Sequence, residues 1–296
     1  METKFAYILK WINLESLKNK FFLFKIHHWI KNLIIFLPVI ASHELSKINI
    51  YEGFFYFFLI SIFSSIIYLI NNTYDYEVDL VNKKKLSYVI NKNKKKLNYI
   101  LGTIFYLFIL SILIFNNNDI WKICLLYFSI AIFYNLQLKK IKYIDIICIS
   151  IFHMTRIIYG SIAFDIDLTT FFLIFFLCLF LMIAFNKRLN EVYLNYKNRP
   201  YKFDDISILK FAQILMGIVI IIFFYFYINS YSSIEFFKNK LYLNFNLILI
   251  ILIILNYLFL SKNRYQDVID FILKNKTNQI LMFLFFLIYL INSNFF

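Results

Sequence analysis

Residues 53–72 read GFFYFFLISIFSSIIYLINN, twenty residues without a charged side chain. An α-helix of this length spans the hydrocarbon core of a bilayer, which is roughly 30 Å thick. Eight further apolar blocks lie near residues 29–45, 98–116, 120–138, 143–164, 168–186, 208–228, 243–261 and 279–295. The sequence therefore predicts an all-α polytopic membrane protein with about nine transmembrane helices.

The composition supports this class. Of 296 residues, 61% are hydrophobic and only 16% are charged, and four Gly and two Pro are too few for a loop-rich or β-rich fold. The net charge of +14 comes from Lys between the apolar blocks, which indicates topology signals and contacts with anionic lipid rather than nucleic acid. We expect one integral membrane domain over residues 1–296, with a possible amphipathic surface helix within residues 1–28. The oligomeric state stays open.

The distribution of Lys and Arg predicts the orientation. With the N-terminus in the cytoplasm, 26 of the 31 Lys and Arg residues fall on the cytoplasmic side, four on the opposite side and one, Arg156, inside a span. The longer loops, 73–97, 187–207 and 262–278, lie on the same side, and long loops tend to carry function. We expect a bacterial inner-membrane protein with a cytoplasmic N-terminus and active site.

The acidic residues at the end of the 53–72 block give the sharpest functional signal. If the helix continues, Asn71, Asp75 and Asp79 recur every four residues and lie on one face, with Asn72 beside them. Carboxylates at this spacing repel one another, whereas Mg²⁺ prefers oxygen ligands and binds through one or two carboxylates together with phosphate oxygens. The pattern predicts a magnesium site. The alternative is a solvated helix end in which Asp79 pairs with Lys83.

Basic residues on the predicted cytoplasmic side are candidate phosphate ligands. Arg156 lies inside a predicted span, where a charge is costly unless it faces a partner or a polar cavity, and its planar fork suits phosphate. Lys187 and Arg188, with Glu191 one turn on, close the next span, and Lys31 lies at the start of the first. The alternatives are a structural ion pair of Arg156 with Asp145 or Asp165, and ordinary topology signals for the other cations.

Asp145 follows the basic run at residues 139–142, where the predicted fifth span begins. Three interpretations are open for it: a second metal ligand, an acid stabilised by the helix dipole, or a partner for the neighbouring Lys residues. The three Cys residues lie singly in apolar blocks and are expected to be buried core residues.

Several of these residues together resemble the UbiA superfamily of membrane prenyltransferases. The family motif NDxxDxxxD is similar to Asn71-Asn72-x-x-Asp75-x-x-x-Asp79, with Asn72 in place of the first Asp. The segments 28–32 (HWIKN) and 134–139, including Tyr134 and Lys139, and the following Asp145 also resemble family segments. The resemblance implies nine helices around a central cavity open to the cytoplasm.

The end of the sixth block points to one branch of that family. Members that use prenyl diphosphates carry a second acidic motif, DxxxD, where this chain has Lys187-Arg188-x-x-Glu191. This arrangement, with Arg156 ahead of Gly160, resembles the decaprenyl-phosphate phosphoribosyltransferase branch. The resemblance implies Mg²⁺-dependent transfer of 5-phosphoribose from 5-phosphoribosyl 1-diphosphate to a polyprenyl phosphate, with release of diphosphate.

The roles that follow fall into three groups. The expected catalytic residues are Asp75, Asp79 and Asn72, the metal ligands Asn71, Asp75 and Asp79, and the substrate-binding residues Lys31, Arg156, Lys187, Arg188, Tyr134, Lys139, Asp145 and Glu191. Two other functions stay open. One is prenyl transfer from a polyprenyl diphosphate to an aromatic or other acceptor, and the other is lipid or ion transport.

Overall fold

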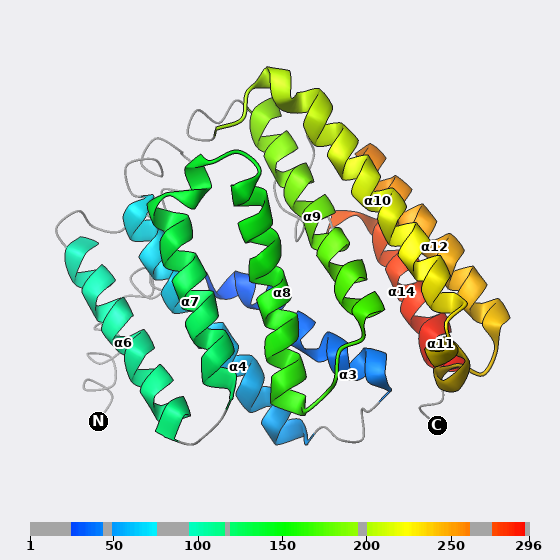
Figure 1. Ribbon diagram of the computed structural model, residues 1–296, viewed down its shortest axis with the longest axis horizontal. Coiled ribbons are helices and arrows are strands. Elements are labelled where there is room, and N and C mark those ends of the chain that lie inside the picture. The colour runs from blue at the N-terminus through cyan, green and yellow to red at the C-terminus, as the bar shows by residue number, and fades with distance from the viewer. Residues whose placement is uncertain are drawn as a thin grey trace, which may run out of the picture. The chain divides into compact units, whose positions relative to one another are not determined.

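The computed structural model describes residues 25–43, 49–75, 95–115, 119–194, 200–260 and 274–293. Within these ranges the regular structure is helical, and the one β pairing is an isolated bridge between Phe237 and Ser293. The elements in Figure 1 are η1 (Ile26–Phe36), α3 (Leu37–Ser42), α4 (Ile50–Tyr74), α6 (Lys95–Phe115), α7 (Ile120–Leu136), η5 (Leu138–Lys140), α8 (Ile144–Phe164), α9 (Thr170–Tyr193), η6 (Phe203–Asp205), α10 (Ile206–Ile228), α11 (Tyr231–Phe236), α12 (Lys240–Leu260) and α14 (Lys276–Asn292). The predicted all-α class is confirmed.

Each predicted apolar block coincides with a helical stretch of the described chain. Five stretches are long and apolar enough to cross a membrane: Ile50–Tyr74, Ile144–Phe164, Thr170–Tyr193, Phe203–Ile228 and Lys240–Phe259. Four shorter apolar stretches are Ile26–Ser42, Tyr99–Ile114, Ile120–Leu136 and Lys276–Asn292. The apolar periods of the sequence thus locate the helices to within a few residues.

The first apolar block is divided into two kinds of helix. Residues Ile26–Phe36 form the 3₁₀ helix η1, and the α-helical turns of α3 begin at Leu37. Pro38 lies in the first turn of α3, where a missing backbone N–H costs no intrahelical hydrogen bond. His43 ends α3 in the left-handed conformation, with φ of 62°. The helix type thus changes next to the proline.

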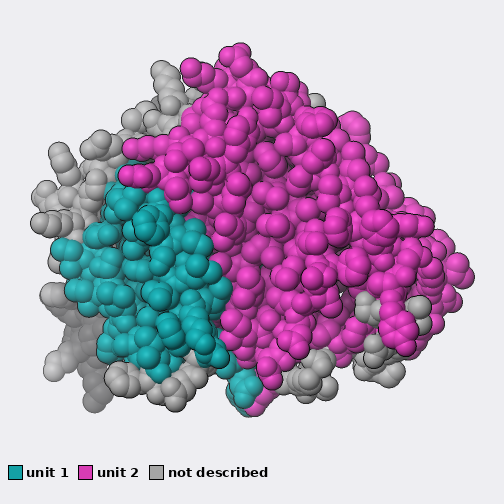
Figure 2. All heavy atoms as spheres, viewed as in Figure 1, with its two compact units in different colours: residues 1–34, 50–136 teal, residues 35–49, 137–296 magenta. Residues whose placement is uncertain are grey.

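The chain divides into two compact units, coloured separately in Figure 2. Unit 1 contains Met1–Ile34 and Ile50–Leu136, and unit 2 contains Ile35–Asn49 and Gln137–Phe296. The expectation of a single domain stays a prediction. Most of the predicted surface helix, residues 1–24, lies outside the described residues.

Unit 1 is built around α4, whose buried serines bind the polar residues of η1. The Trp29 indole donates to Ser65 Oγ at 2.8 Å, and the Asn32 amide donates to Ser61 Oγ at 3.0 Å. Between α6 and α7, the Tyr106 hydroxyl donates to the Cys124 carbonyl at 2.5 Å. These polar groups within the apolar helices are thus paired inside the protein, which a hydrocarbon environment favours.

Unit 2 packs α8, α9, α10, α12 and α14 in series, with α3 against α8 (Figure 1). One of its core clusters joins Met182 of α9, Ile220 of α10 and Ile254 of α12. α10 and α12 approach closely at Gly217, where an added Cβ would lie 3.0 Å from the Ile254 Cγ2 atom, a tight contact with a side chain. All three Cys residues are buried, as predicted, and none is disulfide-bonded.

Candidate functional site: an acidic helix end and a buried ion network

The predicted magnesium residues lie at the C-terminal end of α4 in unit 1. The Asp75 backbone N–H donates to the Asn71 carbonyl at 2.9 Å, so helical hydrogen bonding continues as far as Asp75. This bond places Asn71 and Asp75 one turn apart, on the same side of the helix. Both are half-buried, whereas Asn72 is only 2% exposed. Asp79 and Lys83 lie outside the described residues, so the third turn of the acidic motif stays a prediction.

These side chains supply the oxygen atoms that a hard divalent cation prefers. Asp75 offers a carboxylate and Asn71 an amide carbonyl at adjacent turns, and the partial exposure of both leaves access for phosphate oxygens or water. Among the described residues, no three His, Cys, Asp or Glu side chains cluster as a metal site. A carboxylate and an amide carbonyl at adjacent turns are ligands that suit Mg²⁺, which usually keeps several waters or phosphate oxygens as its other ligands.

Three other predicted substrate-binding residues lie on three different elements. Lys31 is half-buried on η1, and Tyr134 is half-buried near the end of α7. Lys139, which belongs to unit 2, is half-buried on η5. The neighbouring Asn135 is 4% exposed, and its buried Oδ1 atom accepts no hydrogen bond from the part of the chain that the structure describes. Asn135 belongs to the 134–139 segment that resembles the family, but no role was predicted for it.

Unit 2 contains a buried ion network at the N-terminal end of α8 and the C-terminal end of α9. Arg188 of α9 forms ion pairs through Nε with Asp145 and through Nη1 with Glu191. The side chains of Arg188 and Asp145 are fully buried, and that of Glu191 is 18% exposed. Of the three interpretations of Asp145, the structure therefore favours an ion pair, but its partner is Arg188 and not a neighbouring Lys.

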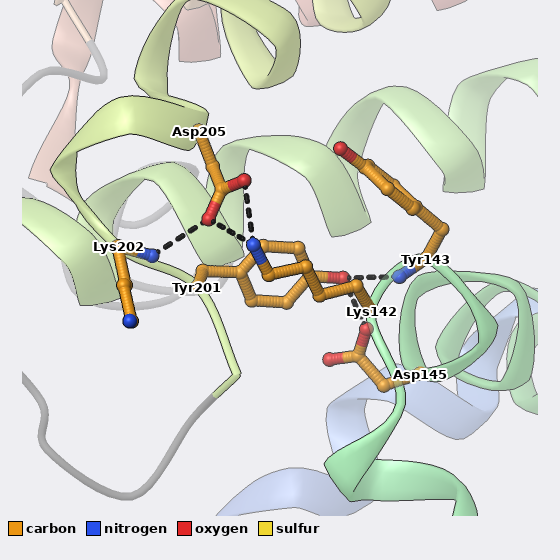
Figure 3. A network of polar contacts seen from close by, with 6 residues as sticks. All are labelled: Lys142, Tyr143, Asp145, Tyr201, Lys202 and Asp205. Atoms are coloured by element: carbon orange, nitrogen blue, oxygen red, sulfur yellow. Dashed lines mark hydrogen bonds and ion pairs between the residues drawn. The ribbon is translucent and has the colours of Figure 1, made fainter.

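Tyr201 joins this network from the segment that precedes α10, as Figure 3 shows. Its hydroxyl donates to the Asp145 carboxylate and accepts the Tyr143 backbone N–H at 2.7 Å. Burial, followed by the hydrogen bond to Asp145, raises the pKa of the Tyr201 hydroxyl well above its ordinary value, so the proton stays on Tyr201. Tyr143 has φ of 66°, a conformation that is rare for a bulky residue, and the bond from its N–H helps to hold it.

A second contact fastens the same two segments together. Lys142 Nζ donates to both carboxylate oxygens of Asp205 at 2.8 Å, and the Lys202 backbone N–H donates to Asp205 Oδ2 at 2.7 Å (Figure 3). Roles for Tyr201, Lys142 and Asp205 were not predicted from the sequence. These contacts join residues that are about sixty positions apart, so no local sequence pattern indicates them. The one hint in the sequence was that polar residues lie near the ends of two apolar blocks.

Arg156 and Lys187 are the two remaining basic residues that were predicted to bind substrate. Arg156 is 3% exposed inside α8, and its Nη1 atom donates to the Phe152 carbonyl one turn earlier. It lies eleven residues after Asp145, a rise of about 16 Å along a helix, which is too long for the predicted ion pair between them. Lys187 is half-buried beside Arg188. The structure thus separates a buried, paired Arg188 from a more accessible Lys187.

A family model for UbiA prenyltransferases matches residues 32–287. The chain belongs to the UbiA prenyltransferase family. The predicted superfamily is thereby confirmed, and the apolar helices together with the family make this UbiA protein an integral membrane protein of an enzyme family. No curated protein matches the chain.

Solved structures support the same fold. A digeranylgeranylglyceryl phosphate synthase matches with 16% identity and a TM-score of 0.63, over 94% of this chain and 98% of that one. A UbiA homologue from Archaeoglobus fulgidus bound to DMAPP and Mg²⁺ matches with 12% identity and a TM-score of 0.66, over 91% and 98%. The same homologue bound to GPP and Mg²⁺ matches with 12% identity and a TM-score of 0.64, over 92% and 96%. At these identities the likeness concerns the fold.

Proposed function

We propose that this UbiA protein transfers 5-phosphoribose from 5-phosphoribosyl 1-diphosphate to a polyprenyl phosphate at the cytoplasmic face of a bacterial inner membrane. The observation that carries the proposal is the half-buried Lys187 at the end of α9, next to Arg188, which already pairs with Asp145 and Glu191. A donor with one diphosphate needs one acidic metal site, whereas its 5-phosphate and the lipid phosphate need cations.

The proposed metal ligands are Asp75 and Asp79 with the amides of Asn71 and Asn72. Mg²⁺, when bound there, would offset the negative charge that develops on the departing diphosphate. Structures of UbiA homologues bound to Mg²⁺ with prenyl diphosphates support a divalent ion in this family. The half-buried Asp75, one turn from Asn71, supports the same role in this chain.

In the proposed reaction, the bond between ribose C1 and the diphosphate oxygen breaks, and diphosphate leaves with the electron pair. A phosphate oxygen of the polyprenyl phosphate forms the new bond to C1. That oxygen is already ionised, so no general base has to remove a proton from it. The contribution of the protein is orientation and electrostatic stabilisation.

We assign the phosphate contacts to Lys31, Arg156 and Lys187. Arg188 was expected to bind phosphate as well, but its Nε and Nη1 atoms already pair with carboxylates and its side chain is fully buried. In this proposal Arg188 acts as a positioning residue. Tyr134 and Lys139 keep their proposed substrate-binding roles, while Asp145 and Glu191 act through Arg188.

Prenyl transfer is the second candidate, since the solved relatives contain DMAPP or GPP. The two functions are separated by supplying purified protein with polyprenyl phosphate and radiolabelled 5-phosphoribosyl 1-diphosphate, or with a labelled prenyl diphosphate and an aromatic acceptor. We expect lipid-linked label from the first donor only, with loss of product on addition of chelator. Lipid product from the prenyl diphosphate alone would refute the proposal.

A matched pair of variants tests whether the reaction requires the proposed acidic site. Asp75→Asn keeps the shape of the side chain and removes the charge at the end of α4. Asp119→Asn makes the same change at an exposed position, where Asp119 pairs with Lys122 on the surface. We expect product formation to fall in Asp75→Asn and to persist in Asp119→Asn. Equal activity in both variants would exclude the acidic site.

A further inference from the structure

The turn that precedes α8 has an unusual backbone. Tyr143 has φ of 66° and ψ of −36°, and the Ile144 N–H donates to the Lys142 carbonyl, two residues earlier, at 2.8 Å. These features are close to those of a classic γ-turn, which is rare and strained. Glycine adopts positive φ without steric cost, whereas a bulky residue such as Tyr does not. The turn therefore needs contacts from elsewhere in the fold to hold it.

The segment before α10 supplies these contacts, all of them within unit 2 (Figure 3). The Tyr201 hydroxyl accepts the Tyr143 backbone N–H at 2.7 Å, and the two rings meet edge to face with their centroids 6.0 Å apart. Lys142 Nζ donates to both carboxylate oxygens of Asp205 at 2.8 Å. Two successive residues of the strained turn are thus held by one short segment.

This segment has a fixed shape of its own. The Lys202 backbone N–H donates to Asp205 Oδ2 at 2.7 Å, and the Asp205 backbone N–H donates to the Lys202 carbonyl at 3.0 Å. These two bonds close the 3₁₀ turn η6, and α10 begins at the next residue, Ile206. Asp205 therefore joins the turn before α8 to the first turn of α10.

The contacts that hold the turn differ in their access to water. The side chain of Lys142 is 40% exposed and that of Asp205 is 10% exposed, so water competes for the ammonium group and weakens this ion pair. Tyr201 is only 6% exposed, and its hydroxyl also donates to the buried Asp145 carboxylate. A strained backbone is thus held partly by a contact that water is able to replace.

We propose that residues 201–205 form a strap with a closed and an open state. In the closed state, which the structure shows, the strap holds Tyr143 at positive φ. In the open state the contacts of the strap with Lys142 and Tyr143 break, and Tyr143 relaxes to negative φ. Asp145 lies two residues further on, in the first turn of α8, so opening changes its position relative to Arg188. That effect on Arg188 rests on the proposed function, in which Arg188 is a positioning residue, whereas the strap does not.

Hydrogen exchange of the purified protein in detergent measures the opening. Asp205→Asn keeps the shape of the side chain and weakens the ion pair, and Asp204→Asn makes the same change at the exposed neighbour. We expect the amides of Tyr143 and Ile144 to exchange about tenfold faster in Asp205→Asn, the usual scale for loss of a charged hydrogen bond. Exchange in the later turns of α8 should not change. Equal exchange at the turn in the two variants would overturn the proposal.

A second pair of variants breaks the same contact from the other side, in case Asp205→Asn folds poorly. Lys142→Gln removes the ammonium group and leaves the hydrogen bonds inside η6 intact. Lys140→Gln removes an exposed charge two residues earlier and is the control. Faster exchange at Tyr143 is expected in Lys142→Gln only. Unchanged exchange in Lys142→Gln would overturn the proposal.

The strain itself is tested by a glycine at the centre of the turn. Tyr143→Gly, added to Asp205→Asn, removes the steric cost of the closed state, so exchange corrected for intrinsic amide rates should slow down. Ile141→Gly in the same background is the control. Ile141 has φ of −100°, so a glycine there adds flexibility without relieving strain and should speed exchange. Unchanged or faster exchange on addition of Tyr143→Gly would mean that the turn is not strained, and would overturn the proposal.

The exchange experiment uses neither substrate, so its failure is distinguishable from that of the proposed reaction. If labelled phosphoribose is not transferred while Asp205→Asn exchanges faster at the turn, the donor assignment is wrong and the strap is supported. If transfer proceeds and exchange is unchanged, the reaction is supported and the strap is rejected.

Discussion

Gly160 of α8 lies so close to Ile35 that a Cβ atom added to the glycine would fall 2.0 Å from the Ile35 carbonyl oxygen. The obstacle is backbone rather than a flexible side chain, and the Ile35 carbonyl carbon and Cα would also lie within 3.0 Å. Only a residue without a side chain permits this approach of α8 to the end of η1. The contact therefore fixes where the first helix crosses α8 within unit 2.

We predict that Gly160→Ala lowers the melting temperature in detergent, because α8 and Ile35 must separate. Overpacking of this kind typically costs about 1–3 kcal/mol, and a backbone obstacle favours the upper end of that range. Gly102→Ala is the control, since its added Cβ would meet side-chain atoms of Ile70 and Leu69 at 3.5 and 3.6 Å, ordinary contact distances. Similar melting temperatures for the two variants would contradict the prediction.

Asp75→Asn is expected to lower the turnover of the phosphoribosyl donor by about 100-fold or more, the usual scale for loss of an electrostatic group that stabilises developing charge. The variant should also need more Mg²⁺ for half-maximal activity, because it has lost a carboxylate ligand. Initial rates measured over a range of Mg²⁺ concentrations give both quantities. A lower rate with an unchanged Mg²⁺ requirement would argue against Asp75 as a metal ligand.

Asn72→Asp tests the departure from the family motif at the same helix end. Asn72 is 2% exposed, so a carboxylate there is buried and destabilising without a cation. We predict a lower melting temperature in chelator and recovery of at least part of the loss with Mg²⁺. Asn246→Asp places a carboxylate at another fully buried position, in α12, and should be destabilised without recovery. Equal responses to Mg²⁺ would refute a metal role for position 72.

The apolar blocks of the sequence were sufficient to predict the helices, because a bilayer-spanning helix must hide its backbone within one continuous segment. The superfamily followed from the resemblance of Asn71-Asn72-x-x-Asp75-x-x-x-Asp79, the HWIKN segment, residues 134–139 and Asp145 to motifs of the family. Both expectations are confirmed by the described helices and by the family match.

The partners of the charged residues were harder to predict. Arg188 was expected to bind substrate phosphate, and nothing in its own helix shows that Asp145, 43 residues earlier, pairs with it. The pairing of Arg188 with Glu191 was easier to predict, because residues three apart in a helix are neighbours. Sequence patterns give contacts within one helix, whereas the pairing between α8, α9 and the Tyr201 segment depends on how separate helices pack.

Tyr201→Phe removes the hydroxyl that joins Asp145 to the Tyr143 backbone while keeping the ring. We predict a loss of stability of about 1–3 kcal/mol, because a buried carboxylate and a backbone N–H each lose a partner. Tyr231→Phe makes the same change at a residue that is 85% exposed and should be close to neutral. Chemical unfolding in mixed micelles compares the two, and a neutral Tyr201→Phe would mean that water replaces the hydroxyl.

His43 provides a prediction of pH dependence. Its ring stacks on Phe236 at 5.1 Å and its Nε2 atom lies 3.2 Å from the Tyr289 hydroxyl, which also donates to the Ile40 carbonyl at 3.3 Å. Burial lowers the pKa of His43 from 6.5 to about 4. The native state therefore favours the neutral ring, and the contacts join the end of α3 to α11 and α14.

The sign of the effect follows from proton binding. Between pH 6.5 and about 4 the unfolded chain holds a proton on His43 that the folded chain does not, so unfolding takes up a proton. The contribution of neutral His43 to the stability of the folded state is thus fully present above pH 6.5 and is lost as the pH falls towards 4. His43→Phe keeps an aromatic ring but cannot titrate. We therefore predict that its melting temperature falls less than that of the wild type over this pH interval. His27→Phe removes an exposed imidazole instead and serves as the control. Parallel wild-type and His43→Phe curves would show that His43 is not the source of the acid sensitivity.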